Sequence, residues 1–519
     1  MTAATTKLRF WIDMALECVR RDHTPMLSAG DQRGPFLTAR ALGMALAALN
    51  DAHAYASGRP PLLNFQDISH LAGKDPDVAG AAACAEVLRL RYPKQAYLLE
   101  LAWLHWLEYF ELGSPESAAA GRAFGTAVHK SGSDDNKKAD NKDDKDKDIY
   151  KPTGKLYTHT APPIEPLQGY AGPQWGDQHP LLATRITNFP PPPGRVSESC
   201  VDRTQHYKED FAKVAIKGNI NRPIGQADGR TLREEVIGIA WGYDGPPELG
   251  TPPRLYMQVV LTVLDAIKAR MNSQLTPVDE LVIIAGVGIA MADAGIDAWH
   301  YKYAPTHMMW RPAVGIRKAE VGNGVADPSW LPFGRPDTNG SQIGVTPDFP
   351  AYPSGHATFG ASAFQLLRLF LVEKGVATFC ENGVDNVCFD FVSDEFNGRN
   401  KDPRTMQPRE HLTLGHTSLW QAIIDNSISR VYLGVHWQFD GVTTRNSTDE
   451  DKFGIPDSPS VLGKTGGVWL GVQIANQIAL NKHLVKEETI NASMGVQVVK
   501  QNESETCVQS VTTEAQKTV

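Results

Sequence analysis

The sequence predicts an all-α protein built from two helical bundles with long irregular connections. Three observations support this prediction. Apolar residues recur at helical spacing over several long segments, strand-like alternation is scarce and short, and no repeat of fixed short period runs along the chain. With 519 residues, of which 42% are apolar, the chain can bury a large core and form more than one packed unit.

The first helical patterns fall within residues 1–130 and suffice for an N-terminal bundle. In each of them, apolar residues three or four positions apart would line one face of a helix. The expected helices are 6–22, 36–56, 77–111 and 115–129.

Residues 131–223 are expected to connect this bundle to the next. Their first part, SGSDDNKKADNKDDKDKD at 131–148, is nearly all small or charged and is therefore predicted to be a solvated loop. The remainder is rich in Pro and Gly, which favours an extended connection draped over helices rather than a separate domain.

Residues 224–482 carry enough helical patterns for a second bundle, and the polar segment 483–519 is expected to be a disordered tail. The longest apolar stretch, Leu281 to Ala292, is too short to cross a bilayer, so we interpret it as a buried bundle helix. The expected helices are 230–240, 254–272, 278–303, 354–373, 409–431 and 467–481.

Charge and termini restrict the partners that we expect. A net charge of -8 provides no basic field for nucleic acid or an anionic membrane, so any anion site must be local. The N-terminus has no pattern of a secretory signal, which leaves a cytoplasmic or non-classically secreted protein. The six cysteines lack the spacing of a zinc site; whether Cys380 and Cys388 pair, and which oligomer forms, stay open.

The segment PAYPSGHATFG is the first candidate for a functional site. Ser354 stands where a proline-fixed segment gives way to an apolar helical pattern, so it is the expected N-cap. A helix start presents unpaired N–H groups, Gly355 permits close approach, and His356 is a candidate base. An ordinary capped helix with a solvent-facing histidine would show the same residues. The segment alone therefore supports an anion site and an ordinary helix start equally.

A second segment, NSISRVYLGVHWQFDG, contains Arg430 and His436. Six positions apart in one helix, the two side chains would point to nearly opposite faces. Gly434 between them is able to end the helix in a left-handed conformation, so that both reach one ligand. Asp440, four residues after His436, is then placed to orient its ring.

Further cations come from WHYKYAPTHMMWRP. Singly, Lys302 and Arg311 are most simply surface charges. Together with Arg430 they would supply three cations, two of them with the forked donors that suit oxyanions.

The residues of these motifs and their order resemble those of the vanadium chloroperoxidases, which share a superfamily with acid phosphatases. The resemblance covers WxxK at 299–302, WRP at 310–312, FPAYPSGHATFG at 349–360 and ISRxxLGVHWxFD at 428–440. It extends to ARALGMALAALNDAHA, TAPP, GPQWGD and WGYDGPPELGTPPRLY, and so to most of the chain outside the charged loop and the tail.

The resemblance implies two four-helix bundles and a vanadate cofactor with His436 as its one protein ligand. By the same matching, Lys302, Arg311, Ser354, Gly355 and Arg430 would hydrogen-bond the vanadate oxygens, His356 would be the acid/base, and Asp244 would pair with Arg430. The interval from Lys302 to Arg311 is two residues longer than in the family pattern, and we assign the extra residues to a loop around Pro305. The resemblance leaves open whether His300 and His307 enter the pocket or lie outside it.

The implied activity is the oxidation of chloride or bromide by hydrogen peroxide to hypohalous acid, which halogenates a small organic acceptor. Phe349 matches a position held by Phe in chloroperoxidases and by His in many bromoperoxidases, so chloride competence is expected; otherwise Phe349 only packs against the helix. The main alternative is an acid phosphatase with His436 as nucleophile. Trp299 and Phe349 favour the peroxidase. A noncatalytic oxyanion-binding protein would leave both histidines unexplained.

Overall fold

The computed structural model describes residues 3–28, 30–66, 68–132, 150–193, 195–197, 200–201, 205–221, 228–270, 275–319 and 324–496. Within these residues the fold is all-α, as predicted, and the strands are confined to three antiparallel two-stranded ladders. The ladders pair β1 (Arg195–Ser197) with β2 (Cys200–Val201), β3 (Phe389–Phe391) with β4 (Leu414–His416), and β5 (Thr444–Arg445) with β6 (Asp451–Lys452).

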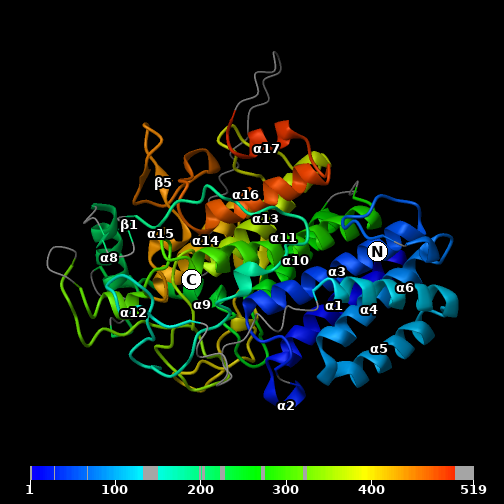
Figure 1. Cartoon of the computed structure of the whole chain (residues 1–519), viewed down its shortest axis with the longest axis horizontal. Coiled ribbons are helices and arrows are strands. Elements are labelled where there is room, and N and C mark those ends of the chain that lie inside the picture. The colour runs from blue at the N-terminus through cyan, green and yellow to red at the C-terminus, as the bar shows by residue number, and fades with distance from the viewer. Residues whose placement is uncertain are drawn as a thin grey trace.

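The N-terminal bundle lies on the right of Figure 1. Its helices are α1 (Ala3–Asp22), α3 (Pro35–Ala56), α4 (Pro76–Arg91) and α6 (Pro115–Lys130), with α5 (Ala96–Tyr109) on the outside. The single helix predicted at 77–111 is wrong, because the chain breaks at Tyr92, where ψ is 63°. Pro93 follows it; proline disfavours helical backbone in the residue before it and cannot donate to the helix.

The second bundle occupies the centre of the molecule. It contains α9 (Leu232–Ala240), α10 (Pro252–Arg270), α11 (Pro277–Tyr303), α13 (Gly355–Glu373), α14 (Leu419–Tyr432) and α16 (Gly467–Asn481). Helix α11 lies against α3 of the first bundle and against α13 and α16 of its own. A Cβ atom on Gly43 of α3 would lie 2.7 Å from the carbonyl oxygen of Gly288, so glycine permits this close contact between the bundles.

Irregular segments and short helices complete the described chain. Residues 150–193 contain one 3₁₀ turn and run across α11, where the buried Asp293 accepts hydrogen bonds from Leu181, Leu182 and Ala183. The short helices are α2 (Pro25–Ser28), α12 (Pro312–Gly315), α15 (Gln438–Gly441) and α17 (Glu487–Ser493), and the 3₁₀ turns are Ser69–Leu71, Pro93–Gln95, Trp175–Asp177, Asp394–Phe396 and Pro459–Val461.

Three further predictions need correction or comment. Helix α8 (Gln205–Lys217) was not predicted within the 131–223 connection; Tyr207, Phe211 and Val214 form its buried stripe. The helix expected at 409–431 begins only at Leu419, because residues 414–416 pair as a strand and Ser418 caps the helix. The tail predicted from 483 folds into α17 with Ile490 buried, so disorder is wrong as far as 496.

Residues 133–148 of the predicted charged loop lie outside the described residues. The same holds for the predicted tail from residue 497 onward. Among the described helices, α11 is long and apolar enough to span a membrane by length and composition. However, 94% of its most apolar window is buried inside the protein, as predicted for a core helix of the bundle.

Candidate active site

The site residues predicted from the sequence come from five places in the chain and meet at one end of the second bundle. Trp299 and Lys302 lie in the last turns of α11, and Arg311 precedes α12. The other residues lie in the segment leading into α13, at the end of α14 and the turn after it, and after α9: Phe349, Ser354, Gly355, His356, Arg430, His436 and Asp244. The contacts described below connect all of them.

The start of α13 contributes Ser354 and Gly355 to the site. Ser354 is the N-cap, as predicted, and its Oγ accepts a hydrogen bond from the backbone N–H of Ala357 at 3.4 Å. The Ser354 N–H donates to the carbonyl of Asp440 at 2.7 Å, and this bond connects the start of α13 to α15, the short helix that follows His436. The ring of Trp299 covers Gly355, where a Cβ atom would lie 3.4 Å from it.

The turn after α14 brings Arg430 and His436 to the same side. Gly434 has φ of +68°, the left-handed conformation that the sequence predicts, and a Cβ atom there would lie 2.5 Å from the carbonyl oxygen of Gly218. Only glycine fits both the backbone conformation and this contact. The chain therefore reverses within four residues and directs His436 toward Arg311.

His436 is held as a neutral imidazole with a defined tautomer. Its Nδ1 lies 2.9 Å from Asp440 Oδ2, and its Nε2 lies 2.8 Å from Nη1 of Arg311. Because a guanidinium can only donate, Nε2 carries the lone pair and Nδ1 carries the proton that Asp440 accepts. Burial, with Arg311 and Lys302 nearby, holds the pKa of His436 well below its ordinary value. His436 thus offers a lone pair at Nε2.

Two buried arginines present donors that lack a partner among the described residues. Arg430 binds both oxygens of Asp244 through Nη2, at 2.9 and 3.0 Å, while its Nε and Nη1 are buried without an acceptor. Arg311 donates through Nε to the carbonyl of Phe349 at 3.0 Å and through Nη1 to that of Val435 at 2.8 Å, while its Nη2 is unpartnered. Unsatisfied buried donors are costly, and an anion would satisfy them.

Lys302 is the third cation and is fully buried. Its ammonium donates to the carbonyls of Pro350, at 2.9 Å, Ala351, at 3.2 Å, and Pro353. It also lies 4.9 Å from the ring centre of Phe349. Burial and the neighbouring Arg311 lower the pKa of Lys302 well below its ordinary value. Lys302 therefore lies near Arg311, although the interval between them is two residues longer than the family pattern.

His356 lies near His436 and helps to lower the pKa of that histidine. Its Nε2 lies 2.7 Å from the carbonyl oxygen of Gly242 and 3.8 Å from Asp244 Oδ1. A carbonyl only accepts, so Nε2 carries the proton and Nδ1 carries the lone pair. Burial and the nearby Arg430 lower the pKa of His356 to about 3, and the imidazole is neutral at pH 7.

Aromatic rings form the wall between these polar groups and the bundle core. Trp299 packs against Phe349 with ring centres 4.8 Å apart, and its indole N–H donates to the carbonyl of Ala171 at 3.2 Å. A cleft of about 390 Å³ opens onto this wall and is lined by Asp244, Phe349 and His356 at its inner end. The cleft gives the site access to small molecules.

The structure also settles the placement of two histidines and adds groups that sequence reasoning missed. His307 contacts the carbonyl of Phe189 at 3.0 Å, and the backbone of His300 packs closely on Gly176, away from the cation cluster. The missed groups are backbone carbonyls, namely those of Gly242 and of the proline-rich segment around Lys302. Backbone atoms leave no residue-type signal beyond the prolines that fix their direction.

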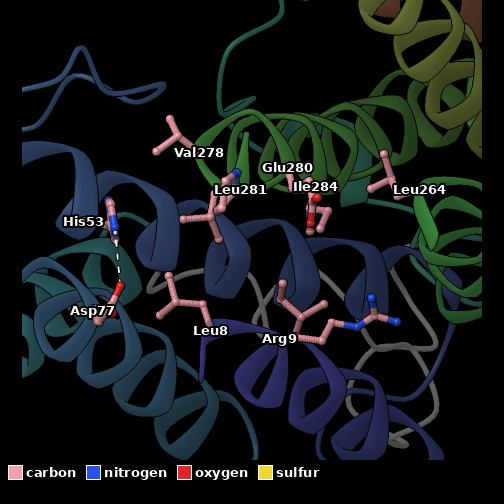
Figure 2. Close-up of a pocket in the computed structure, with 11 residues that line it drawn as sticks. Leu8, Arg9, His53, Asp77, Leu264, Val278, Glu280, Leu281 and Ile284 are labelled. Atoms are coloured by element: carbon pink, nitrogen blue, oxygen red, sulfur yellow. Dashed lines mark ion pairs between the residues drawn. The ribbon is translucent and has the colours of Figure 1, made fainter. Parts of the chain in front are cut away.

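A separate apolar pocket lies at the far end of α11, between α1 and α10 (Figure 2). Leu8, Leu264 and Ile284 line it, and the only ion pair drawn in Figure 2 joins His53 to Asp77 at 3.6 Å. At 1.5 Å per residue, the 18 residues from Ile284 to Lys302 place the pocket about 27 Å from the cation cluster. It takes no part in that site.

Comparisons with known proteins agree with this geometry. A family model described as the VCPO second helical-bundle domain matches residues 282–450. The vanadium chloroperoxidase of Curvularia inaequalis is 33% identical over 362 residues, which cover 62% of this chain but only 58% of that protein's length. The motifs at 299–302, 310–312, 349–360 and 428–440 fall within residues 282–450.

Solved structures share the fold at low sequence identity. A bacterial vanadium-dependent iodoperoxidase superposes with a TM-score of 0.59 at 18% identity, covering 93% of this chain and 98% of its own. An apo-type bacterial vanadium-dependent chloroperoxidase superposes with a TM-score of 0.54 at 15% identity, covering 91% of this chain and 96% of its own. At this identity the likeness concerns the fold, and it extends over both bundles.

Proposed function

We propose that this chain is a member of the vanadium haloperoxidase family, that it binds vanadate between His436 and His356, and that it oxidises a halide with hydrogen peroxide. The product would be hypohalous acid, which halogenates a small organic acceptor. One observation carries the proposal: two buried arginines with unpartnered donors, and the buried Lys302 beside them, lie close to two neutral imidazoles.

The residues present fit a tetrahedral or trigonal-bipyramidal oxyanion. Arg311 Nη2 and Arg430 Nε and Nη1 are buried donors without an acceptor in the described chain, and the capped start of α13 adds backbone N–H groups. Asp244 and Asp440 are bound by Arg430 and His436, so neither carboxylate accepts from these unpartnered donors, which remain for a negative ligand. In our proposal Lys302, Arg311, Ser354, Gly355 and Arg430 hold its oxygens.

His436 supplies the protein ligand in this proposal. Its Nε2 lone pair is the donor that an electrophilic vanadium centre requires, and Asp440 increases the basicity of the ring by accepting the Nδ1 proton. When bound, vanadate would act as a Lewis acid that draws electron density from the O–O bond of hydrogen peroxide, so that a halide attacks it.

His356 and Lys302 would manage protons and charge. His356 is neutral at pH 7 and holds a lone pair at Nδ1, so it is placed to accept a proton from incoming hydrogen peroxide and to return it later. The Lys302 ammonium, fixed by three carbonyls, would stabilise negative charge that develops on the reacting oxygen.

The halide range is part of the proposal. Phe349 borders the cleft and leaves no titratable side chain at that position, and the family pattern associates Phe there with chloride oxidation. We therefore propose chloride competence in addition to bromide. Turnover with chloride, bromide and iodide over a pH series tests this; bromide activity with no chloride activity at any pH contradicts it.

The activity itself is tested by reconstitution. Protein freed of vanadate is assayed for phosphate-ester hydrolysis, then incubated with orthovanadate and assayed for peroxide- and bromide-dependent halogenation of a soluble β-diketone. We expect halogenation only after vanadate is added, and its loss in His436→Ala. Ester hydrolysis without any vanadate-dependent halogenation would indicate an acid phosphatase with His436 as nucleophile.

A further inference from the structure

The cleft in front of the site contains two arginines that no carboxylate neutralises. Arg33 lies between α2 and α3 and is exposed, and Arg335 lies in the loop between α12 and α13 and is half-buried. Neither forms an ion pair within the described part of the chain. Because the chain as a whole carries a net charge of -8, two such cations in one cleft indicate a local site for an anionic group.

Arg335 is held in a fixed position beside the inner end of the cleft. Its backbone N–H donates to the carbonyl of Val345 at 2.8 Å, and its Nη1 donates to the carbonyl of Asp244 at 2.9 Å. Its Nε is buried without a partner, and its Nη2 has no hydrogen-bond partner among the described residues. Since one nitrogen anchors the guanidinium, the remaining donors are oriented before any ligand binds.

The three carboxylates that line the cleft do not pair with these arginines. Asp244 is bound by Arg430 at 2.9 Å. Glu165 accepts a hydrogen bond from a side-chain amide at 3.0 Å. Asp348 lies near Arg311, where it opposes the lowering of the pKa of that arginine by burial. Each carboxylate is therefore engaged elsewhere, and the positive charge in the cleft remains for a ligand.

The rest of the cleft wall suits a carbon skeleton. Besides Phe349, five prolines line it: Pro25, Pro35, Pro247, Pro252 and Pro347. Proline rings are apolar and rigid, so an organic molecule packs against them without ordering flexible side chains. A wall of this kind with a few fixed polar donors, around a volume of about 390 Å³, is typical of a site for a small organic molecule that carries one charged group.

We infer that this cleft binds the organic acceptor, and that the acceptor carries a carboxylate that Arg33 and Arg335 hold. The inference rests on the proposed function, which supplies the oxidant. With a phenol as the reacting part, the halogen of HOX forms a bond to a ring carbon, and the proton displaced from that carbon combines with the hydroxide of HOX to give water. The bound carboxylate keeps the ring in the cleft, where it meets the oxidant before bulk solution does.

The test compares two phenols that differ in charge far from the ring. A hydroxyphenylpropionate and its methyl ester are given together, in equal amounts, to the vanadate-loaded protein with peroxide and bromide. Because two methylene groups separate the ring from the carboxyl group, reagent hypobromous acid should brominate both alike. We expect the protein to brominate the propionate at least about tenfold in preference to the ester, the ratio that one charged hydrogen bond supplies.

Variants identify the residues responsible. Arg33→Gln and Arg335→Gln should each lower the acid-to-ester ratio toward that of the reagent, and Arg335→Lys should retain part of the preference because it keeps the charge. Arg399→Gln is the matched control for Arg33→Gln, since Arg399 is also exposed and lies outside the cleft lining; its ratio should equal that of the native chain.

Calorimetric titration of the propionate into the vanadate-loaded protein, without peroxide, gives a readout that does not depend on turnover. The Kd should rise about tenfold in Arg33→Gln and stay unchanged in Arg399→Gln. Arg33 makes no hydrogen bond to the described residues, so this variant tests the inference without loosening the fold.

Three results would overturn the inference and leave the haloperoxidase activity standing. An acid-to-ester ratio equal to that of the reagent means that the acceptors meet the oxidant in solution. A preference unchanged by both Arg33→Gln and Arg335→Gln places the acceptor elsewhere. A higher KM for bromide in these variants, with the ratio unchanged, assigns the arginines to the halide. Failure to brominate either phenol would instead overturn the proposed function.

Discussion

Replacing Asp244 by Asn should weaken the fold yet strengthen anion binding. Asp244 holds Arg430 through both carboxylate oxygens, at 2.9 and 3.0 Å, and the Arg430 side chain is fully buried. The substitution keeps the shape of the side chain and removes its charge. Arg430 then remains as a buried cation whose other donors, Nε and Nη1, already lack an acceptor.

The size of the effect follows from burial and distance. Unit charges about 4 Å apart attract by about 4 kcal/mol at an effective dielectric of 20, and breaking a buried pair costs about 3–5 kcal/mol. We therefore expect Asp244→Asn to lower the free energy of unfolding by about 3 kcal/mol without an anion. A bound anion supplies a new counter-charge and no longer faces the Asp244 carboxylate, so its affinity should rise about tenfold, or about 1.4 kcal/mol.

The assay is urea denaturation with and without saturating orthovanadate, together with calorimetric titration of vanadate. Asp293→Asn is the control: Asp293 is 1% exposed and accepts the backbone N–H groups of Leu181, Leu182 and Ala183 instead of binding a cation of the site. It should destabilise the protein equally with and without the anion. If vanadate stabilises Asp244→Asn no more than the native chain, the anion does not sit at Arg430 and the reasoning fails.

Three further predictions concern positioning, protonation and backbone. Asp440→Asn should weaken vanadate binding about 10–100-fold by freeing the His436 ring, whereas Asp210→Asn, a buried carboxylate nearby, should not; equilibrium titration measures both. The pKa of His356 is about 3 when folded and about 6.5 when unfolded, so its contribution to stability is lost as pH falls below 6.5, by about 3 kcal/mol at pH 4.5; denaturation of His356→Gln should show a shallower loss. Gly434→Ala should cost at least about 2 kcal/mol in thermal unfolding, and a neutral result would contradict the left-handed turn.

Long periodic patterns predicted most of the helices, because burial of one face depends on spacing that is visible in the chain. Helix α11 and the N-cap at Ser354 are examples. The failures have local causes: Pro93 divides one pattern, and a strand pair at Leu414 competes with another. Helix α8 escaped prediction because the surrounding proline-rich composition outweighed its short apolar stripe.

The residues of the candidate site were predictable, but their protonation states were not. The types of Arg311, Arg430 and His436 suggest an anion site, and Gly434 explains how the last two converge. Their burial, and the carbonyl of Gly242 that fixes the His356 tautomer, depend on segments distant in the sequence. Sequence motifs carry residue types, whereas pKa values depend on how much water the finished fold excludes.

The N-terminal bundle contributes to the chemistry through contacts rather than through reacting groups. Phe36 of α3 packs against Trp299 with ring centres 4.8 Å apart, and thereby fixes the wall behind Phe349. The segment between α1 and α3 supplies Arg33 and part of the cleft lining. A protein that only bound an oxyanion would not need this aromatic wall. The first bundle therefore acts on the site by holding Trp299 in place behind Phe349 and by forming one side of the cleft.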